Sequence, residues 1–166
     1  MNYTTTPYAN DDYQFVYNVK KIVYQTYVEQ NWGEWNEKKQ QEYFAEFIQN
    51  NAKHIKIISN NHEKIGFFHG SIDNNGDYEL GNICILPAYQ GKGLGTKILK
   101  DIIDKHKDQN IYLQYFKQNP VERLYTRLGF KKINETNFHI QMELKNNNQR
   151  RNNHESNWTK KLNKNI

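Results

Sequence analysis

The chain has 166 residues, of which 25% are charged and 14% aromatic, and its formal net charge is +5. This length suits one domain with a real core, no apolar run approaches the length of a membrane span, and the single Cys84 excludes an internal disulfide or a cysteine-based zinc site. Nucleic-acid binding by a folded part has little electrostatic support: residues 146–166 carry five basic side chains against one acidic one, a net +4, which leaves +1 for the other 145 residues.

Hydrophobic spacing and turn residues predict seven strands and four helices. In chain order they are a strand at 2–6, helices at 12–29 and 36–49, strands at 54–59, 63–72 and 77–86, a helix at 93–107, a strand at 111–116, a short helix from 119 to 129, and strands at 130–134 and 138–144. Pro7 is expected to stop the first strand. Asn119 suits the cap of the short helix, and Pro120 suits its first position.

This order predicts an α+β fold with a mixed, mostly antiparallel sheet flanked by helices. Parallel pairing is expected at the strand that precedes residues 87–93. Residues 1–145 should form the domain. The Asn-rich, basic tail at 146–166 has too few apolar side chains to offset the entropy of ordering, so we expect it to be disordered. With no charged-then-apolar leader at the start of the chain, we expect a cytoplasmic protein without membrane contact.

The most informative stretch joins the strand at 77–86 to the helix that follows it. Three glycines, Gly91, Gly93 and Gly95, lie directly before an amphipathic run. A strand, a glycine loop and a helix N-terminus together can bind phosphate through free backbone N–H groups. The dinucleotide fingerprint fails because position 96 is Thr96, and the nucleotide-triphosphate loop fails because its Gly-Lys-Ser/Thr order is missing. A strand–helix connection that is merely glycine-rich stays open at this point.

The pattern Gln/Arg-x-x-Gly-x-Gly/Ala is matched by Gln90, Gly93 and Gly95, and it resembles the acyl-CoA pyrophosphate loop of the GNAT acetyltransferase superfamily. Residues 119–130 (NPVERLYTRLGF) resemble the second signature of that superfamily, an Asn followed by a short helix ending in Leu-Tyr-x-x-Leu-Gly-Phe. Here one residue fewer separates Asn119 from the Tyr than in many members. With both motifs in order, and the predicted element order matching, the chain is identified as a bacterial-type member with the GNAT acyl-CoA N-acyltransferase fold.

The resemblance implies that acetyl-CoA is the acyl-donor cosubstrate. Backbone N–H groups of the loop would bind its pyrophosphate, and the backbone of the preceding strand would pair with the amides of its pantetheine arm. An N–H at the end of that strand, that of Ile85 or a neighbour, would polarise the thioester carbonyl. Lys97 could also meet a phosphate, although each cation has the alternative of a solvated surface charge. The implied cofactor-binding residues are Ile83, Cys84, Ile85, Gln90, Gly91, Lys92, Gly93, Leu94, Gly95, Thr96, Asn119 and Arg123.

Two catalytic residues are implied by the same resemblance. Tyr125 matches the tyrosine that gives a proton to the leaving thiolate, with a core aromatic as the alternative. Glu79 lies eleven residues before Gln90, a spacing similar to that of the glutamate base in the histone-acetylating branch. The alternative for Glu79 is an exposed strand residue, with the proton relayed through water and backbone. For Cys84 a covalent acetyl-cysteine is conceivable, but a small buried apolar residue is the commoner meaning.

Trp32, Glu34 and Trp35 fall where these enzymes build the acceptor pocket, and they suit a cationic amine through cation–π and charge attraction; core anchoring is the alternative for the tryptophans. The six histidines have no metal-ligand spacing, so no metal is expected, although His69 and His139 lie in predicted strands that could reach the cleft.

The sequence thus predicts direct acetyl transfer to a primary amine, the acceptor being a small cationic amine. The rivals are a protein or peptide N-acetyltransferase, a non-catalytic acyl-CoA-binding module and an RNA-binding protein acting through its tail. Nucleic acid is otherwise not expected as a partner, and a homodimer is left open.

Overall fold

The computed structural model describes residues 2–146 and contains a seven-stranded sheet with the order β1-β2-β3-β4-β5-β7-β6. All neighbouring strands are antiparallel except β4 and β5. The bounds are β1 Thr4–Pro7, α1 Tyr13–Trp32, α2 Glu37–Asn51, β2 Ile55–Asn60, β3 Glu63–Ile72, β4 Tyr78–Ile85, α3 Leu94–Lys105, β5 Ile111–Phe116, α4 Glu122–Arg127, β6 Lys131–Glu135 and β7 His139–Leu144. The predicted order of strands and helices is therefore confirmed.

Two predicted boundaries are wrong. Pro7 does not stop β1 but is its last residue, paired with Lys56. β1 is an edge strand, where the missing N–H of a proline is tolerated. The short helix α4 begins at Glu122, and Asn119 is not its cap: the Asn119 N–H donates to the carbonyl of Phe116 in the turn that leaves β5. The predicted domain boundary at 145 stays a prediction, and the predicted disorder of the tail concerns residues that, from 147 on, lie outside those described.

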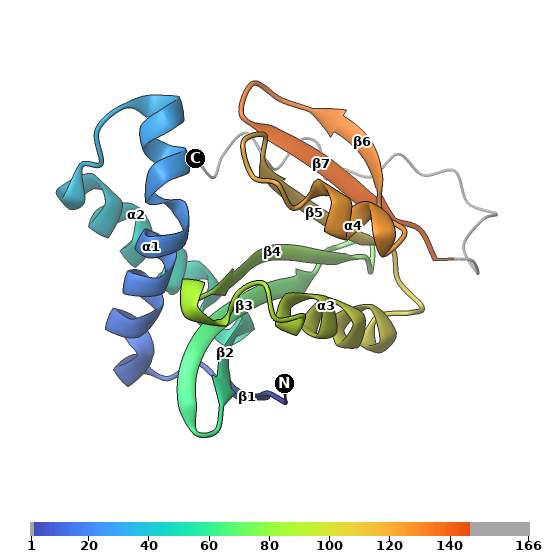
Figure 1. The fold of residues 1–166 in the computed structure, drawn as a ribbon, viewed down its shortest axis with the longest axis horizontal. Helices are drawn as coiled ribbons and strands as arrows, with labels where there is room; N and C mark the ends of the chain where they lie inside the picture. The colour runs from blue at the N-terminus through green and yellow to red at the C-terminus, as the bar shows by residue number, and fades with distance from the viewer. Residues whose placement is uncertain (1, 147–166) are drawn as a thin grey trace.

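The helices cover the two faces of the sheet and enclose two apolar cores (Figure 1). On one face, α3 buries Leu94, Ile98, Leu99 and Ile102, and α4 adds partly buried side chains at its edge. On the other face, α1 and α2 pack on β2–β4 around Phe44 and Phe67. Each helix thus buries one stripe, as the spacing of its apolar residues requires.

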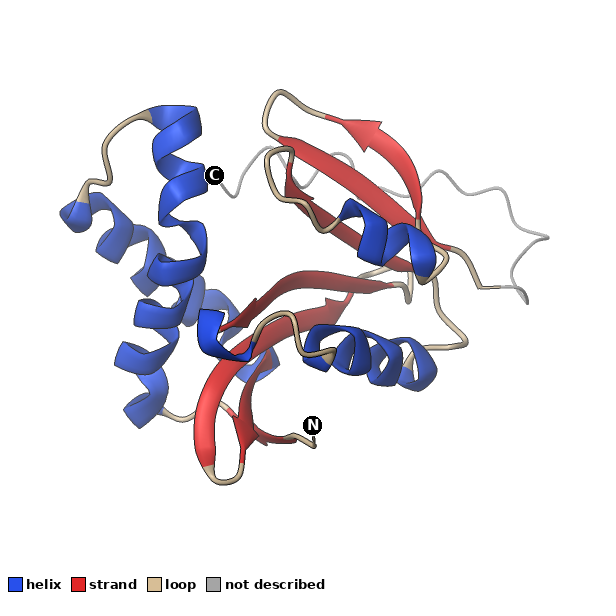
Figure 2. Cartoon of the chain, in the orientation of Figure 1, coloured by secondary structure: helices blue, strands red, loops and turns tan. Residues whose placement is uncertain are grey.

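The sheet comes apart between β4 and β5. These strands pair only from Tyr78–Leu80 to Ile111–Leu113, and the rest of each strand pairs on its other side alone. Figure 2 shows the result as two groups of strands, β1–β4 and β5–β7, that diverge from this short parallel contact. The divergence exposes a stretch of β4 backbone from Gly81 to Ile85 that has no strand partner on the β5 side.

A bulge at Gly81 sits where the divergence starts. Asn82 lies opposite His69 and Leu80 opposite Gly70, so Gly81 has no partner of its own in the ladder. A Cβ at this position would lie 2.1 Å from Cε1 of the His69 ring, so any other residue would require that ring to move. The extra residue reverses the alternation of faces: Tyr78, Leu80, Ile83 and Ile85 all face the core under α3, whereas Cys84 faces the core under α1.

Candidate active site

The glycine loop lies between the end of β4 and the start of α3. Gly91 and Gly93 have φ of 72° and 81°, values that favour glycine. Gly93 is the N-cap of α3 and supplies no side-chain capping bond, so the N–H groups of the first turn, from Leu94 to Thr96, are left for an outside acceptor. Open space surrounds Gly91 and Gly93. The loop therefore offers a polar backbone surface suited to an anion.

The side chain of Gln90 holds this loop to the strand before it. Its Nε2 donates to the carbonyl oxygen of Ile85 at 2.7 Å. This bond fixes the distance between the exposed edge of β4 and the helix N-terminus. The structure thus gives the Gln90 side chain a supporting position, and the backbone from Ile83 to Ile85 lies along the edge of β4 that has no strand partner on the β5 side.

The cations near the loop differ in how they are held. The Nζ of Lys92 donates to the carbonyl of Ala88 at 2.8 Å, and that of Lys97 lies 5.6 Å from the centre of the Tyr3 ring. Arg123 is exposed on α4, where it lines an open surface hollow with Glu122, Thr126 and Arg127. Asn119 lies in the turn between β5 and α4.

A group of polar side chains, partly buried apart from the fully buried Cys84, lies at the divergence, and we call it the transfer cluster. It consists of Tyr24 from α1, Asn82 and Cys84 from β4, and Tyr125 from α4. Asn82 Nδ2 donates to the Tyr24 hydroxyl at 2.9 Å. Burial is the main cause that raises the pKa of Tyr125 well above its usual range, with electrostatic contributions from Cys84 and Tyr115. Tyr125 thus keeps its proton at neutral pH.

The thiol of Cys84 is unsuited to a covalent role. Its side chain is 0% exposed. Burial raises the pKa of Cys84 to about 12, against the opposing effect of a hydrogen bond from Tyr24. Because the thiolate is the reactive form, a thiol with this pKa is a poor nucleophile at neutral pH. The structure supports the reading of Cys84 as a small core residue.

Glu79 lies in the paired part of β4, opposite Ser71 of β3 and Tyr112 of β5. Its neighbours Tyr78 and Leu80 face the core under α3, so its own side chain points to the α1 side of the sheet. Because of the bulge, Asn82 points to the same side, where it meets Tyr24. Glu79 therefore shares a face of β4 with Asn82 and Cys84 of the transfer cluster.

The three predicted acceptor residues do not lie together. Trp32 ends α1 and joins an aromatic cluster of six side chains, in which Tyr24, Tyr27, Trp32 and His139 contact Phe116 and Phe138 contacts Trp32. Its ring lies 4.5 Å from that of Phe138, yet 42% of the residue is exposed. Glu34 is exposed in the loop after α1. This cluster bridges α1 to β5 and β7 across the divergence.

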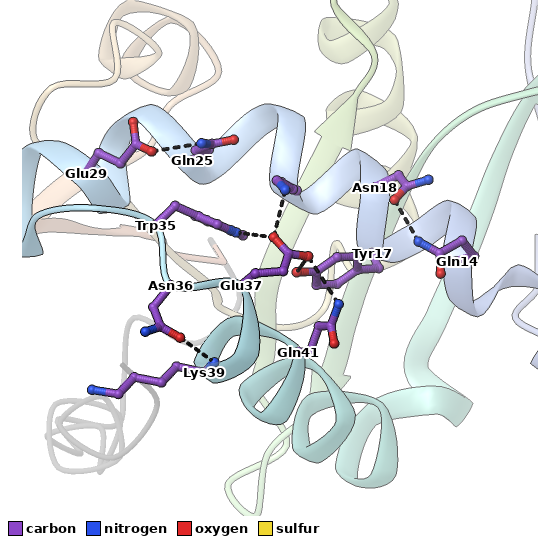
Figure 3. Close-up of polar contacts among 11 residues, drawn as sticks. Gln14, Tyr17, Asn18, Gln25, Glu29, Trp35, Asn36, Glu37, Lys39 and Gln41 are labelled. Carbon is purple, nitrogen blue, oxygen red and sulfur yellow. Dashed lines mark hydrogen bonds and ion pairs between the residues drawn. The ribbon is translucent and has the colours of Figure 1, made fainter.

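Trp35 instead joins a polar network between α1 and the start of α2 (Figure 3). Its Nε1 donates to the Glu37 carboxylate at 2.9 Å, which also accepts from Lys21 at 2.7 Å and from the Tyr17 hydroxyl at 2.6 Å. The bonds from Lys21, Tyr17 and Trp35 lower the pKa of Glu37 to about 2. These contacts connect α1 to α2 and favour a structural role for Trp35.

Sequence reasoning missed Tyr24 and Asn82. One signal was available for Tyr24, because it lies seven residues after the buried Tyr17 and so falls on nearly the same helix face. Asn82 had no such signal, since its direction depends on the bulge at Gly81. His69 and His139 were expected to be able to reach the cleft; His69 lies beside the transfer cluster, opposite Asn82, and His139 belongs to the aromatic cluster.

Residues 2–146 contain neither a membrane-spanning helix nor a group of metal ligands. No helix among them is long and apolar enough to cross a membrane. No group of three or more His, Cys, Asp or Glu side chains among them could hold a metal ion.

Known proteins similar to this chain include several N-acetyltransferases. Over 69 residues the chain is 42% identical to the spermine/spermidine N(1)-acetyltransferase of Bacillus subtilis (39% of this chain, 45% of the relative), and over 84 residues it is 34% identical to the ribosomal protein bS18-alanine N-acetyltransferase of Haemophilus influenzae (48% and 55%). It is also 33% identical over 58 residues to the N-alpha-acetyltransferase RimI of Mycobacterium tuberculosis. These matches span only 37% to 55% of the relatives' lengths.

Solved structures share the fold over a longer range. The PaiA N-acetyltransferase of Thermoplasma acidophilum, in complex with coenzyme A, has a TM-score of 0.66 at 19% identity, covering 87% of this chain and 99% of that one. An acetyltransferase of Thermus thermophilus reaches 0.69 at 13% identity, covering 87% and 97%. A model of the acetyltransferase (GNAT) family matches residues 21–130, which is more than half of the chain, and the chain therefore belongs to that family.

Proposed function

We propose that the protein is an acetyl-CoA-dependent N-acetyltransferase that moves an acetyl group to a primary amine by direct attack in a ternary complex. The observation that carries the proposal is the β4 edge at Gly81–Ile85, which has no strand partner on the β5 side, together with the glycine loop that follows it and the partly buried Tyr125 of α4. Acetyl-CoA offers a pyrophosphate group, an arm with amides and a thioester. The loop, the strand edge and the phenol match these three needs in the same order.

The chain supplies proton transfers at two positions. Tyr125 is held protonated by its burial, so its hydroxyl can give a proton to a leaving sulfur. Glu79 lies on the α1 side of the sheet, three positions before Asn82, and can take the proton of the attacking amine directly or through water. Acid and base thus lie on different elements, α4 and β4.

The acceptor is proposed to approach along α1, where Trp32 leaves an aromatic face exposed next to the divergence. A cationic amine is attracted to such a face, and similarity to a spermine/spermidine acetyltransferase supports a small cationic acceptor. Of the other two predicted residues, Glu34 lies in the adjoining exposed loop and can add negative charge, whereas Trp35 is engaged by Glu37.

Thiol release from acetyl-CoA across a library of amines tests the proposal. The library should hold polyamines, amino sugars, amino acids and short peptides with a free N-terminus. Turnover that is fastest with di- or polycationic amines supports the proposal. Turnover with N-terminal peptides alone would replace the acceptor with a protein. No turnover, despite binding of coenzyme A, would favour a non-catalytic binding module, and RNA binding lost with residues 146–166 would mark a separate role for the tail.

A further inference from the structure

Tyr24 is the residue of α1 that reaches both strands of the divergence. Its hydroxyl accepts a hydrogen bond from Asn82 of β4, and its ring lies 5.7 Å from that of Phe116 of β5. It is also close enough to Cys84 and to Tyr125 to interact with both electrostatically. Tyr24 thus lies near both the β4 edge and Tyr125, the two parts of the site that the proposed reaction uses.

The bond from Asn82 determines which way the Tyr24 proton can point. Asn82 Nδ2 occupies a lone pair of the Tyr24 oxygen, so Tyr24 is the acceptor in that contact. Within residues 2–146 its own O–H donates to no oxygen or nitrogen atom; its contact is with the Cys84 sulfur, a weak acceptor. A phenol that accepts one hydrogen bond also becomes a stronger donor of the next. The site therefore holds an activated hydroxyl without a strong partner.

The orientation of Asn82 is itself set by the Gly81 bulge and by His69 of the neighbouring strand β3. The Gly81 bulge turns Asn82 to the α1 side, opposite His69 in the ladder. The His69 ring packs on Gly81 and against Phe47, with 5.2 Å between ring centres. Burial lowers the pKa of His69 to about 4, so this support is uncharged at neutral pH. The position of the Tyr24 hydroxyl thus depends on Asn82 of β4 directly and on His69 of β3 indirectly.

We propose that the Tyr24 hydroxyl is a second, side-chain hydrogen-bond donor to the carbonyl oxygen of the acyl group, oriented by Asn82. This inference rests on the proposed function. No covalent bond forms on Tyr24: its proton stays on the phenol and stabilises the negative charge that gathers on the carbonyl oxygen when the amine attacks. Tyr125 remains the donor to the leaving sulfur. Tyr24 is a catalytic residue under this proposal, and Asn82 is a positioning residue.

The direct test is the infrared stretching frequency of a ¹³C-labelled acetyl carbonyl in acetyl-CoA bound without any acceptor. A hydrogen bond from Tyr24 lowers this frequency, so we expect Tyr24→Phe to raise it toward the value in water-free solvent. Tyr13→Phe is the matched control, because it makes the same change on α1 against Phe44, away from the site. An equal frequency in wild type and Tyr24→Phe would overturn the proposal.

Kinetics give a second readout. We expect Tyr24→Phe to lower kcat about a hundredfold, the usual effect of losing one oxyanion donor, with the KM for acetyl-CoA nearly unchanged. Asn82→Asp keeps the shape but turns the neighbour into an acceptor that captures the Tyr24 proton, so it should lower kcat similarly, and the double variant should lose no more than either single one. A kcat for Tyr24→Phe within twofold of wild type would overturn the inference.

The outcomes separate the two proposals. A lowered carbonyl frequency that depends on Tyr24, without turnover of any amine, would uphold the inference and contradict the proposed function. Turnover that does not depend on Tyr24 would do the reverse. Circular dichroism and melting temperature of each variant identify any loss of folding.

Discussion

The two sides of the β4–β5 divergence use different parts of the chain. On the α3 side, the surface offered to a ligand is mainly backbone: the glycine loop, the helix N-terminus and the free edge of β4. On the α1 side it is made of side chains, in the transfer cluster and the aromatic cluster. Backbone can bind a constant group whatever the surrounding sequence, whereas side chains can be exchanged to suit a particular partner. The proposed donor and acceptor sites divide along this line.

Tyr125 connects the two sides, and its loss should have the largest effect. We expect Tyr125→Phe to lower kcat by at least a hundredfold, because general acid catalysis typically contributes that much or more. Binding of acetyl-CoA, measured by calorimetry, should change little. Thiol release at saturating substrates measures kcat. A variant that keeps wild-type kcat would move the acid role elsewhere and reduce Tyr125 to a core aromatic.

The α1 side should respond to acid through His69. Its pKa is about 4 in the folded protein, chiefly through burial, against about 6.5 when unfolded. The unfolded chain therefore takes up a proton first, and stability present above pH 6.5 is lost as the pH falls toward 4. The full difference corresponds to about 3 kcal/mol.

Urea unfolding at several pH values measures this loss. His69→Gln should have a flatter profile between pH 6.5 and 4. His62→Asn is the control, since His62 is exposed and its positive φ of 67° suits Asn. Parallel profiles for wild type and His69→Gln would contradict the prediction.

The α3 side should respond to backbone strain. Gly93→Ala places a side chain at a φ of 81°, which costs about 1–2 kcal/mol and displaces the loop. We expect the KM for acetyl-CoA to rise about tenfold, while the KM for the amine stays the same. Gly76→Ala carries the same strain at a φ of 84° in a distant turn, and it should lower stability without affecting either KM. Equal effects of the two variants on KM would remove the loop from the proposed site.

The smallest effect is expected for Trp32, whose loss should change the KM for the amine instead of the KM for acetyl-CoA. Trp32→Ala should raise the KM for a cationic amine about fivefold, in line with about 1 kcal/mol for one cation–π contact, and leave the KM for acetyl-CoA unchanged. Trp35→Phe removes the bond to Glu37 and should lower the melting temperature without raising either KM. If both variants affected the amine alike, the acceptor region would extend over the whole loop between α1 and α2.

The order of the elements and the conformation of the glycine loop could be predicted from local sequence. Element order follows from hydrophobic spacing and turns, and the positive φ of Gly91 and Gly93 follows from glycine at a loop that enters a helix. The directions of Trp32 and Trp35 could not be predicted, because they depend on whether Phe138 or Glu37 is in reach. The start of α4 was missed because Asn119 is held by the turn after β5 instead of capping the helix.

The bulge at Gly81 has a consequence for how this strand can change. In a regular strand Glu79 and Asn82 would point to opposite faces, since they are three residues apart. The one unpaired glycine puts both on the α1 side, while Ile83 and Ile85 stay with Tyr78 in the opposite core. Deleting Gly81 would therefore restore regular alternation along the strand. Every other residue would be kept, but Glu79 and Asn82 would then point to opposite faces of the sheet. A one-residue insertion or deletion in this strand would need a second one to return the side chains to their faces, whereas a substitution changes one side chain only.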